Sequence, residues 1–306
     1  MSRRSRPAWV YVVLTALLAV LLLTLWLGED SGNRHAVPQQ VRVPDVVFEE
    51  SGLHDIGPSQ LPVSVGTKAA PEPLKHRGIA LILDDVGYDL PALRRALALQ
   101  IPMAIAILPN APHAVEAAKL AHAAGYPVML HMPMEPANPH YREHMDNSFI
   151  RVGMQREEVR RLMEEALARV PYVEGVNNHM GSGLTALEEP MRWVMEICRE
   201  HKLFFIDSRT NKDTVAARMA RDSGLRWGER RVFLDDSVEP ELLKKSWRRT
   251  RTRLAKDGSV IVIAHPHRET LDFLQKTMSG KDRDAMVPLA GLLFPAVRHD
   301  EAIATK

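Results

Sequence analysis

The stretch Ile79-Ala-Leu-Ile-Leu-Asp84-Asp85-Val-Gly87 decides the fold. A short aliphatic run bounded by turn residues is typical of a buried strand. Because burying unpaired charge is expensive, two adjacent carboxylates do not belong in the middle of a core strand. At the carboxyl end of a parallel strand the same pair can face a cleft, where one acid can hold a metal and the other a proton. The alternative is that the pair caps the next helix or begins a loop.

The same pattern recurs along the chain. Further apolar runs end in polar residues at His131, at Asn178-His179, at Asp207, at Asp235-Asp236 and at His265-Pro-His267. Together with Met103–Ile107, about seven strands alternate with helical patterns, which predicts a parallel sheet. The spacing of about 25 to 30 residues per unit fits a (β/α) barrel and equally an open doubly wound sheet. In a barrel the carboxyl ends of the strands carry the active site, so these polar ends predict one site assembled from several strands.

The amino-terminal segment Ala8–Leu27 contains no charged residue and follows Arg3, Arg4 and Arg6. It is long enough to span a bilayer as a helix, and its basic flank places the amino terminus in the cytoplasm. The competing interpretation is a cleaved signal peptide, which usually has a shorter apolar region and a small-x-small site. Because Leu25-Trp-Leu-Gly-Glu-Asp30 contains no such site, we expect an uncleaved anchor. The catalytic part is then extracytoplasmic, and periplasmic if the cell has two membranes.

The sequence divides the chain into three segments. Residues 1–27 form a basic tip and membrane anchor, residues 28–76 a proline-containing tether, and residues 77–306 one domain large enough for a substantial core. The only cysteine, Cys198, cannot form an intramolecular disulfide, and we expect it to be a small core residue. The net charge of +2 is too balanced to indicate a nucleic-acid partner. We expect the basic stretch Lys244–Arg251 to be a solvated helix face, with contact to an anionic polymer or lipid head groups as the alternative.

Three of the thirteen histidines stand out, because His131, His179 and His265 each end or directly follow a predicted strand. Zinc binds histidine nitrogen and aspartate oxygen, and a catalytic zinc site keeps one position open for water. Two histidines and one carboxylate are also the ligands of non-haem iron(II) oxygenases, whose sites usually lie on other scaffolds. We therefore expect a divalent metal, with zinc ranked first.

These motifs resemble those of polysaccharide deacetylases, which are metal-dependent carbohydrate esterases on a distorted (β/α) barrel. Leu83-Asp84-Asp85 is similar to the opening motif of that family, which implies that Asp84 is the base and Asp85 a metal ligand. Ile263-Ala-His265 is similar to the late Leu-x-His motif, which implies that His265 is the general acid. Gly125–His131 is similar to the approach to the histidine motif. The resemblance extends over essentially all of Gly78–Pro295.

Two motifs depart from the family pattern. The usual His-x-x-x-His is absent, because Glu135 stands four residues after His131. The arginine-proline motif of the next strand is replaced by Asn177-Asn178-His179-Met-Gly-Ser182. The chain is therefore similar to the divergent polysaccharide deacetylase branch, and we expect His179 to take the place of the second histidine.

The resemblance implies a metal-dependent hydrolase that removes acetyl groups from a cell-envelope glycan. The amino-terminal segment separately predicts that the protein is attached to the inner membrane through its helix. The implied metal ligands are Asp85, His131 and His179. The implied catalytic residues are Asp84, as base, and His265, as acid. Three further residues are expected to orient these groups or to contact sugar hydroxyls, namely Asn178, Asp207 and His267. The alternatives are a catalytically silent glycan-binding protein and an envelope scaffold on the same barrel.

Overall fold

The structure is a computed structural model that describes residues 77–296. The predicted anchor and tether, residues 1–27 and 28–76, lie outside the described residues, and so does the end of the predicted domain. Within the described range, no helix is both long enough and apolar enough to cross a bilayer.

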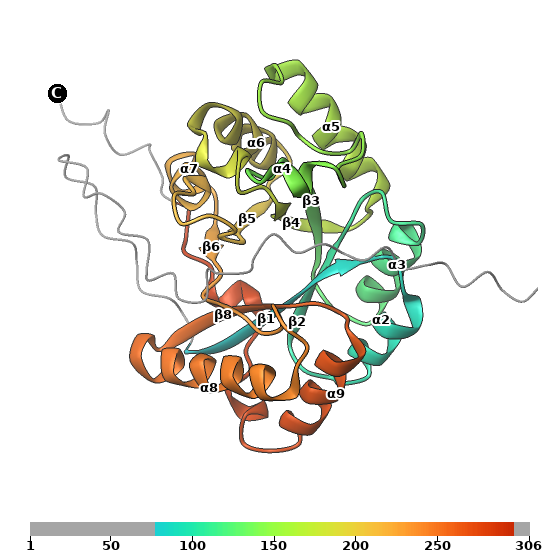
Figure 1. The fold of residues 1–306 in the computed structure, drawn as a ribbon, viewed down its shortest axis with the longest axis vertical. Coiled ribbons are helices and arrows are strands. Elements are labelled where there is room, and N and C mark those ends of the chain that lie inside the picture. Colours follow the sequence, from blue (N-terminus) through green and yellow to red (C-terminus); the bar gives the residue numbers. More distant parts are fainter. Residues whose placement is uncertain (1–76, 297–306) are drawn as a thin grey trace, which may run out of the picture. The chain divides into compact units, whose positions relative to one another are not determined.

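Eight parallel strands form a single sheet that curls into a half-barrel, in the order β6-β5-β4-β3-β2-β1-β8-β7 (Figure 1). The strands are β1 (Gly78–Val86), β2 (Met103–Ile107), β3 (Val128–Met134), β4 (Val173–Met180), β5 (Phe204–Asp207), β6 (Trp227–Glu229), β7 (Val232–Phe233) and β8 (Ser259–Ala264). The prediction of a parallel, barrel-like α/β fold is confirmed. The sequence predicted about seven strands; it missed β6, whose three residues are too few to show an apolar run.

The two edge strands, β6 and β7, are consecutive in the chain. Between them, Arg230 N donates a hydrogen bond to Asp207 O of β5 at 2.9 Å, and Arg231 N donates to Ile261 O of β8 at 2.9 Å. One short segment therefore pairs first with β5 and then with β8. This crossing brings the two sides of the sheet together and explains why both edge strands are so short.

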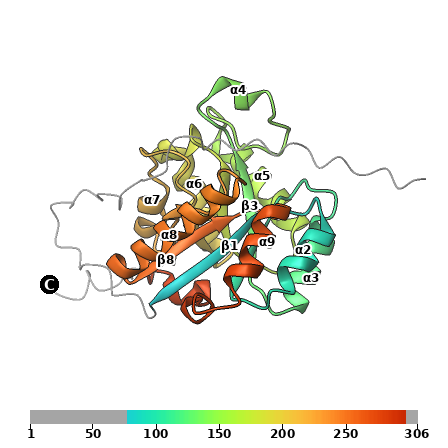
Figure 2. The same cartoon turned by 60° about the horizontal axis from the view of Figure 1, so that its bottom comes forward.

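Helices cover the outer face of the sheet (Figures 1 and 2). They are α2 (Leu90–Leu97), α3 (Ala114–Ala123), α5 (Arg156–Arg169), α6 (Glu188–Glu200), α7 (Ala216–Asp222), α8 (Pro240–Asp257) and α9 (Arg268–Thr277). The short α4 (Pro139–Arg142) lies in the long connection after β3 and projects beyond the carboxyl end of that strand (Figure 2). Local signals set the helix ends: the side chain of Asp89 accepts from Ala92 N at 2.9 Å at the start of α2, and Gly258, with φ 80°, ends α8.

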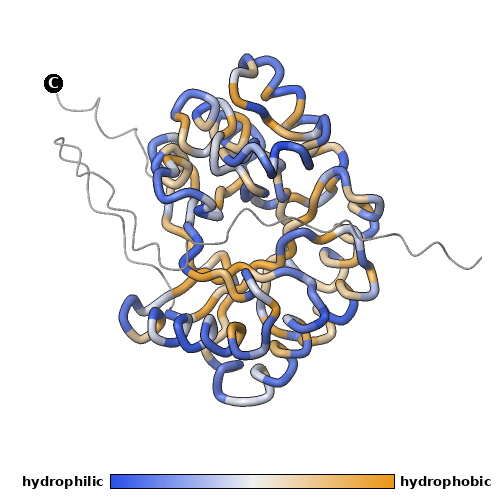
Figure 3. Tube along the Cα trace, viewed as in Figure 1, coloured by the Kyte–Doolittle hydropathy of each residue, from blue (hydrophilic) through white to orange (hydrophobic). Residues whose placement is uncertain are grey.

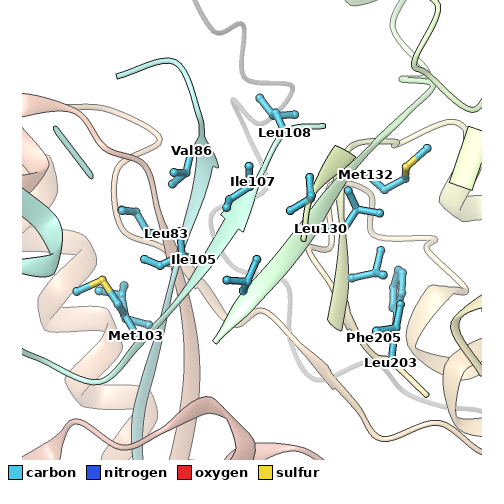
Figure 4. Close-up of a cluster of buried hydrophobic side chains, with 14 of the residues drawn as sticks. Leu83, Val86, Met103, Ile105, Ile107, Leu108, Leu130, Met132, Leu203 and Phe205 are labelled. Carbon is cyan, nitrogen blue, oxygen red and sulfur yellow. The ribbon is translucent and has the colours of Figure 1, made fainter. Parts of the chain in front are cut away.

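Alternate residues along each strand face two separate apolar layers, as the two-residue period of a strand requires. Leu83, Ile105 and Leu130 belong to the layer between the sheet and the helices, which is drawn in Figure 4. Cys198 of α6 is fully buried in the same layer, as predicted. Figure 3 shows the apolar residues concentrated in the central strands, with the polar residues on the outer turns of the helices.

The inner layer is lined by small and branched residues, such as Ala80, Ala104 and Ile263. The 3₁₀ helix η3 (Leu289–Leu292) supplies Leu289 and Leu292 to this layer. The inside of the half-barrel is therefore a packed core below its polar carboxyl end. A packed interior of this kind holds the strand ends in place and so positions the site.

We expect Gly175→Ala to lower the free energy of unfolding by about 1–3 kcal/mol, because overpacking a tight interior forces neighbours to shift. A Cβ atom at Gly175 of β4 would lie 2.2 Å from the ring of Phe204 on β5. Chemical denaturation of both proteins measures the difference. Gly280→Ala is the matched control, since no atom lies within 4 Å of its added Cβ. Equal destabilisation by the two changes would contradict the packing argument.

Candidate active site

Asp84 and Asp85 both point into the carboxyl end of the half-barrel, although neighbours on a regular strand face opposite sides. The β1–β2 register shifts between Leu83 and Val86, and Asp85 has a φ of 56°. This bulge, with one residue in the left-handed region, turns the second carboxylate towards the first. Asp84 Oδ2 lies 3.7 Å and Asp85 Oδ1 3.1 Å from Nε2 of His131.

Three ligand atoms form a nearly equilateral triangle at this end. The distance from His131 Nε2 to Asp85 Oδ1 is 3.1 Å, from His179 Nδ1 to Asp85 Oδ1 3.0 Å, and from His179 Nδ1 to His131 Nε2 3.1 Å. Ligands about 2.1 Å from a common metal ion are about 3.0 to 3.4 Å apart for bond angles between 90° and tetrahedral. The three atoms therefore fit three coordination positions of one cation, and a tetrahedral ion held there would have a fourth position for water.

The surroundings of Asp85 also fit a cation. Both of its carboxylate oxygens are buried without a hydrogen-bond partner among the described residues, and the imidazole nitrogens of His131 and His179 lie 3.1 and 3.0 Å from Oδ1. Burial opposes ionisation of Asp85, but the adjacent His179 and His131 outweigh it and hold the pKa of the carboxyl well below its usual range. An ionised, buried carboxylate with uncommitted oxygens is a good ligand for a divalent metal.

Asp84 lies beside this triangle in a different environment. It is 1% exposed, and Asn177 Nδ2 donates to its two oxygens at 2.9 Å each. Burial raises the pKa of Asp84, because it outweighs the opposing influence of His131 and His265. Asp84 is therefore a stronger base than its neighbour, as a proton acceptor beside a metal site requires.

His265 follows β8 on the other side of Asp85, with Nε2 4.0 Å from Asp85 Oδ2. Its Nδ1 lies 2.9 Å from Asp235 Oδ1, and its backbone N donates to Asp235 Oδ2 at 2.8 Å. Burial disfavours the charged imidazole, but Asp235 outweighs burial and raises the pKa of His265 to about 10. His265 is therefore protonated at neutral pH and can act as a proton donor.

Asp235, His265 and His267 form a second group whose potential ligand atoms lie close together. Both oxygens of Asp235 are already occupied, one by the His265 ring and the other by His265 N and the hydroxyl of Thr270 at 2.7 Å. The bonds of Asp235 therefore make it the partner of His265 rather than an open ligand.

The departure from His-x-x-x-His has a structural explanation. Glu135, which stands where the second histidine would be, accepts a hydrogen bond from Val152 N at 2.8 Å and pairs with Arg142 Nε at 3.1 Å. It fixes the long connection after β3. His179 lies opposite Pro133 in the β3–β4 ladder, so its ring reaches the position next to His131 from the neighbouring strand.

The three remaining predicted residues lie at different places. Asn178 is buried, donating to Met180 O at 2.7 Å and accepting from Ser208 N at 2.9 Å, and so holds the chain after His179. Asp207 is fully buried and accepts from Arg209 N, Thr214 Oγ1 and Ala217 N, which orders the loop after β5. His267 is partly buried at the start of α9, with its ring 6.0 Å from that of His265, and burial lowers its pKa.

Two residues that the sequence motifs did not single out complete the site, namely Asn177 and Asp235. Asp235 ends a predicted strand, but no spacing rule pairs it with His265, which is thirty residues away in the chain. Asn177 precedes the two predicted site residues of its motif, and its partners Asp84 and His131 become apparent only in the fold.

The residues of this site lie within a region that matches a known protein family. A family model described as divergent polysaccharide deacetylase matches residues 81–293, which include every residue of the site. The chain belongs to the divergent polysaccharide deacetylase family. This confirms the resemblance inferred from the sequence motifs.

Two relatives and one solved structure each match most of this chain. YibQ of Escherichia coli (strain K12), described as an uncharacterized protein, is 32% identical over 238 residues, or 78% of this chain and 74% of its own length. An uncharacterized protein of Haemophilus influenzae (strain Rd) is 32% identical over 228 residues, 74% of this chain and 79% of that protein. A crystal structure of an uncharacterized protein from Agrobacterium tumefaciens C58 has a TM-score of 0.65 at 16% identity and covers 72% of this chain and 92% of its own. At that identity the likeness shows the fold alone.

We expect Asp235→Asn to lower the pKa of His265 from about 10, because a neutral amide no longer stabilises the imidazolium. A raised folded-state pKa contributes stability below the unfolded value of about 6.5, and this contribution is lost as the pH rises through about 10. As the pH rises from about 6.5 to about 10, the free energy of unfolding should therefore decrease more in the wild type than in the variant. NMR titration of His265 and denaturation at several pH values measure both effects.

The exposed Asp213 provides the matched control, since Asp213→Asn removes the same charge away from the site. It should leave both the His265 titration and the pH dependence of stability unchanged. An unaltered His265 titration in Asp235→Asn would show that Asp235 does not control the imidazole.

Proposed function

We propose that the protein is a metal-dependent hydrolase that removes acetyl groups from a carbohydrate of the cell envelope. The observation that carries the proposal is the triangle of Asp85, His131 and His179 with a basic carboxylate, Asp84, on one side and a protonated imidazole, His265, on the other. Membership of the deacetylase family supports the reaction class and the carbohydrate substrate.

The two histidines and Asp85 would hold the ion, and zinc suits nitrogen and carboxylate ligands of this kind. A divalent cation bound there supplies a Lewis acid for the acetyl carbonyl and lowers the pKa of water. Burial of Asp85 and His131 keeps the surrounding medium poor in water, which strengthens electrostatic interactions in the site.

Asp84 accepts the proton that the attacking water loses as its oxygen bonds to the carbonyl carbon. The raised pKa of this carboxyl suits it to the task. Its two bonds from Asn177 keep the carboxylate beside the ligand triangle without adding a charge.

His265 donates a proton to the amide nitrogen as the carbon–nitrogen bond breaks, so that the amine and acetate are released. Asp235 holds Nδ1 of the ring and leaves Nε2 directed towards Asp85 and the reaction centre. The proposed base and acid thus come from two neighbouring strands of the sheet, β1 and the end of β8, whereas His131 and His179 come from β3 and β4.

We further propose that the amino-terminal segment anchors the protein in the inner membrane and that the catalytic domain is extracytoplasmic. The support is the charge-free segment Ala8–Leu27 behind three arginines and the proline-containing stretch that follows it. A periplasmic domain on a tether would be placed to reach the cell-envelope glycan.

The division of roles between the two aspartates can be tested by substitution. We expect Asp84→Asn to keep the metal but lower turnover by about 10² to 10⁴-fold, because an amide keeps the shape but cannot accept the proton. Asp85→Asn should instead lose metal, since a neutral amide oxygen is a poorer ligand than a carboxylate. Metal content and release of acetate from acetylated chitooligosaccharide or peptidoglycan fragments are measured on the same preparations.

Loss of metal in Asp84→Asn with retention in Asp85→Asn would reverse the two assignments. If the wild-type protein binds zinc yet releases no acetate from these glycans, the proposed deacetylase activity is contradicted. Glycan binding that persists unchanged in chelator would then favour the silent binding protein on the same fold.

We expect the intact chain to sediment with membranes and to be released by detergent rather than by high salt, because an apolar helix and not charge would hold it there. Fractionation of expressing cells with detection of both chain ends measures this. Intact chain in the soluble fraction would contradict the anchor, and a shortened chain there would indicate cleavage.

A further inference from the structure

Asn177 lies between the proposed base and a proposed metal ligand. It is fully buried on β4 and stands directly opposite His131 in the β3–β4 ladder. Its Oδ1 lies 3.0 Å from His131 Nδ1, and its Nδ2 lies 2.9 Å from each oxygen of Asp84. The oxygen and the nitrogen of this one amide therefore bond to two different residues, which come from two other strands.

The contact with Asp84 determines which way the amide points. If the amide were reversed, its oxygen would lie 2.9 Å from both carboxylate oxygens, where two acceptors repel each other. With the NH₂ group on Asp84, the amide oxygen must face His131 Nδ1, so that nitrogen carries the hydrogen. When His131 is neutral, as a metal-binding imidazole must be, its lone pair is then on Nε2, the atom that lies 3.1 Å from both Asp85 and His179.

We propose that Asn177 is a positioning residue that holds Asp84 in place and fixes the metal-binding tautomer of His131. The inference rests on the proposed function for the role of Asp84. Residues that bond the outer nitrogen of a metal-binding imidazole typically change metal affinity by about 10- to 100-fold when they are replaced. The amide performs both tasks without burying another charge, which matters in a site where Asp84, Asp85 and His131 are already nearly inaccessible.

Two substitutions separate the two tasks. Asn177→Asp keeps an acceptor for His131 Nδ1 but replaces the donor to Asp84 with a second carboxylate, whereas Asn177→Leu keeps the approximate size and loses both bonds. Zinc affinity is measured by calorimetry on the full chain in mild detergent, and turnover is measured as acetate release. We expect Asn177→Leu to lose about 10- to 100-fold in zinc affinity and to lose turnover. Asn177→Asp should bind zinc at least as well as wild type and lose about tenfold or more in turnover.

The matched control is Ser208→Ala. Its hydroxyl is the third and longest partner of Asn177 Nδ2, at 3.3 Å, and no hydrogen bond of this hydroxyl to Asp84 or His131 is present in the described structure. Zinc affinity and turnover should both stay within about threefold of wild type, since the two short bonds of Asn177 remain. Thermal unfolding of each variant without metal shows whether the fold is intact.

Wild-type zinc affinity in a folded Asn177→Leu protein would overturn the proposal, and so would equal loss of affinity in the Asp and Leu variants. If the Leu variant does not fold, Asn177→Asp decides alone: retained affinity with lost turnover supports the proposal, and lost affinity contradicts it. A wild type that binds zinc but has no deacetylase activity would refute the proposed function. The affinity pattern would then still test the link between Asn177 and His131.

Discussion

Two adjacent carboxylates are buried at the end of β1, and the polar structure around them compensates for that burial. Asp84 and Asp85 are 1% and 5% exposed, in a position where an unpaired charge would be strongly unfavourable. His131 and His179 approach Asp85, and Asn177 donates to Asp84. The left-handed backbone at Asp85, a conformation that costs about 1–3 kcal/mol, brings both acids to the same place. The surrounding packed core maintains this arrangement.

The environment gives the two acids different properties. Burial dominates at Asp84 and raises its pKa, whereas two imidazoles outweigh burial at Asp85 and lower its pKa. At His265, the carboxylate of Asp235 outweighs burial and raises the pKa of the imidazole. Groups of similar chemistry with pKa values pushed apart are a common arrangement in acid–base catalysis. In this site the different pKa values arise from residues on three strands, β1, β3 and β4, and on the segments that follow β7 and β8.

The departures from the family motifs are linked to each other in space. Glu135 uses its carboxylate to hold Val152 and Arg142, so the connection after β3 is ordered by the residue that would otherwise be a ligand. The proposed ligand His179 comes instead from β4, and Asn177, two residues earlier on the same face, reaches Asp84. One strand thus carries both changes, and the rearranged site still brings two histidines and one aspartate together.

The sequence by itself determined the parallel α/β fold, the strand ends that carry Asp84, Asp85, His131, His179 and His265, and the family. These follow from local features, since an apolar run and the polar residue that ends it are adjacent in the chain. Only the tertiary structure decided the partners of these residues. In a flat sheet β1 and β4 would be about 14 Å apart, three strand spacings, yet Asn177 bonds to Asp84 because the sheet curls. The pairing of His265 with Asp235 and the short strand β6 likewise depend on contacts between distant segments, which no local pattern records.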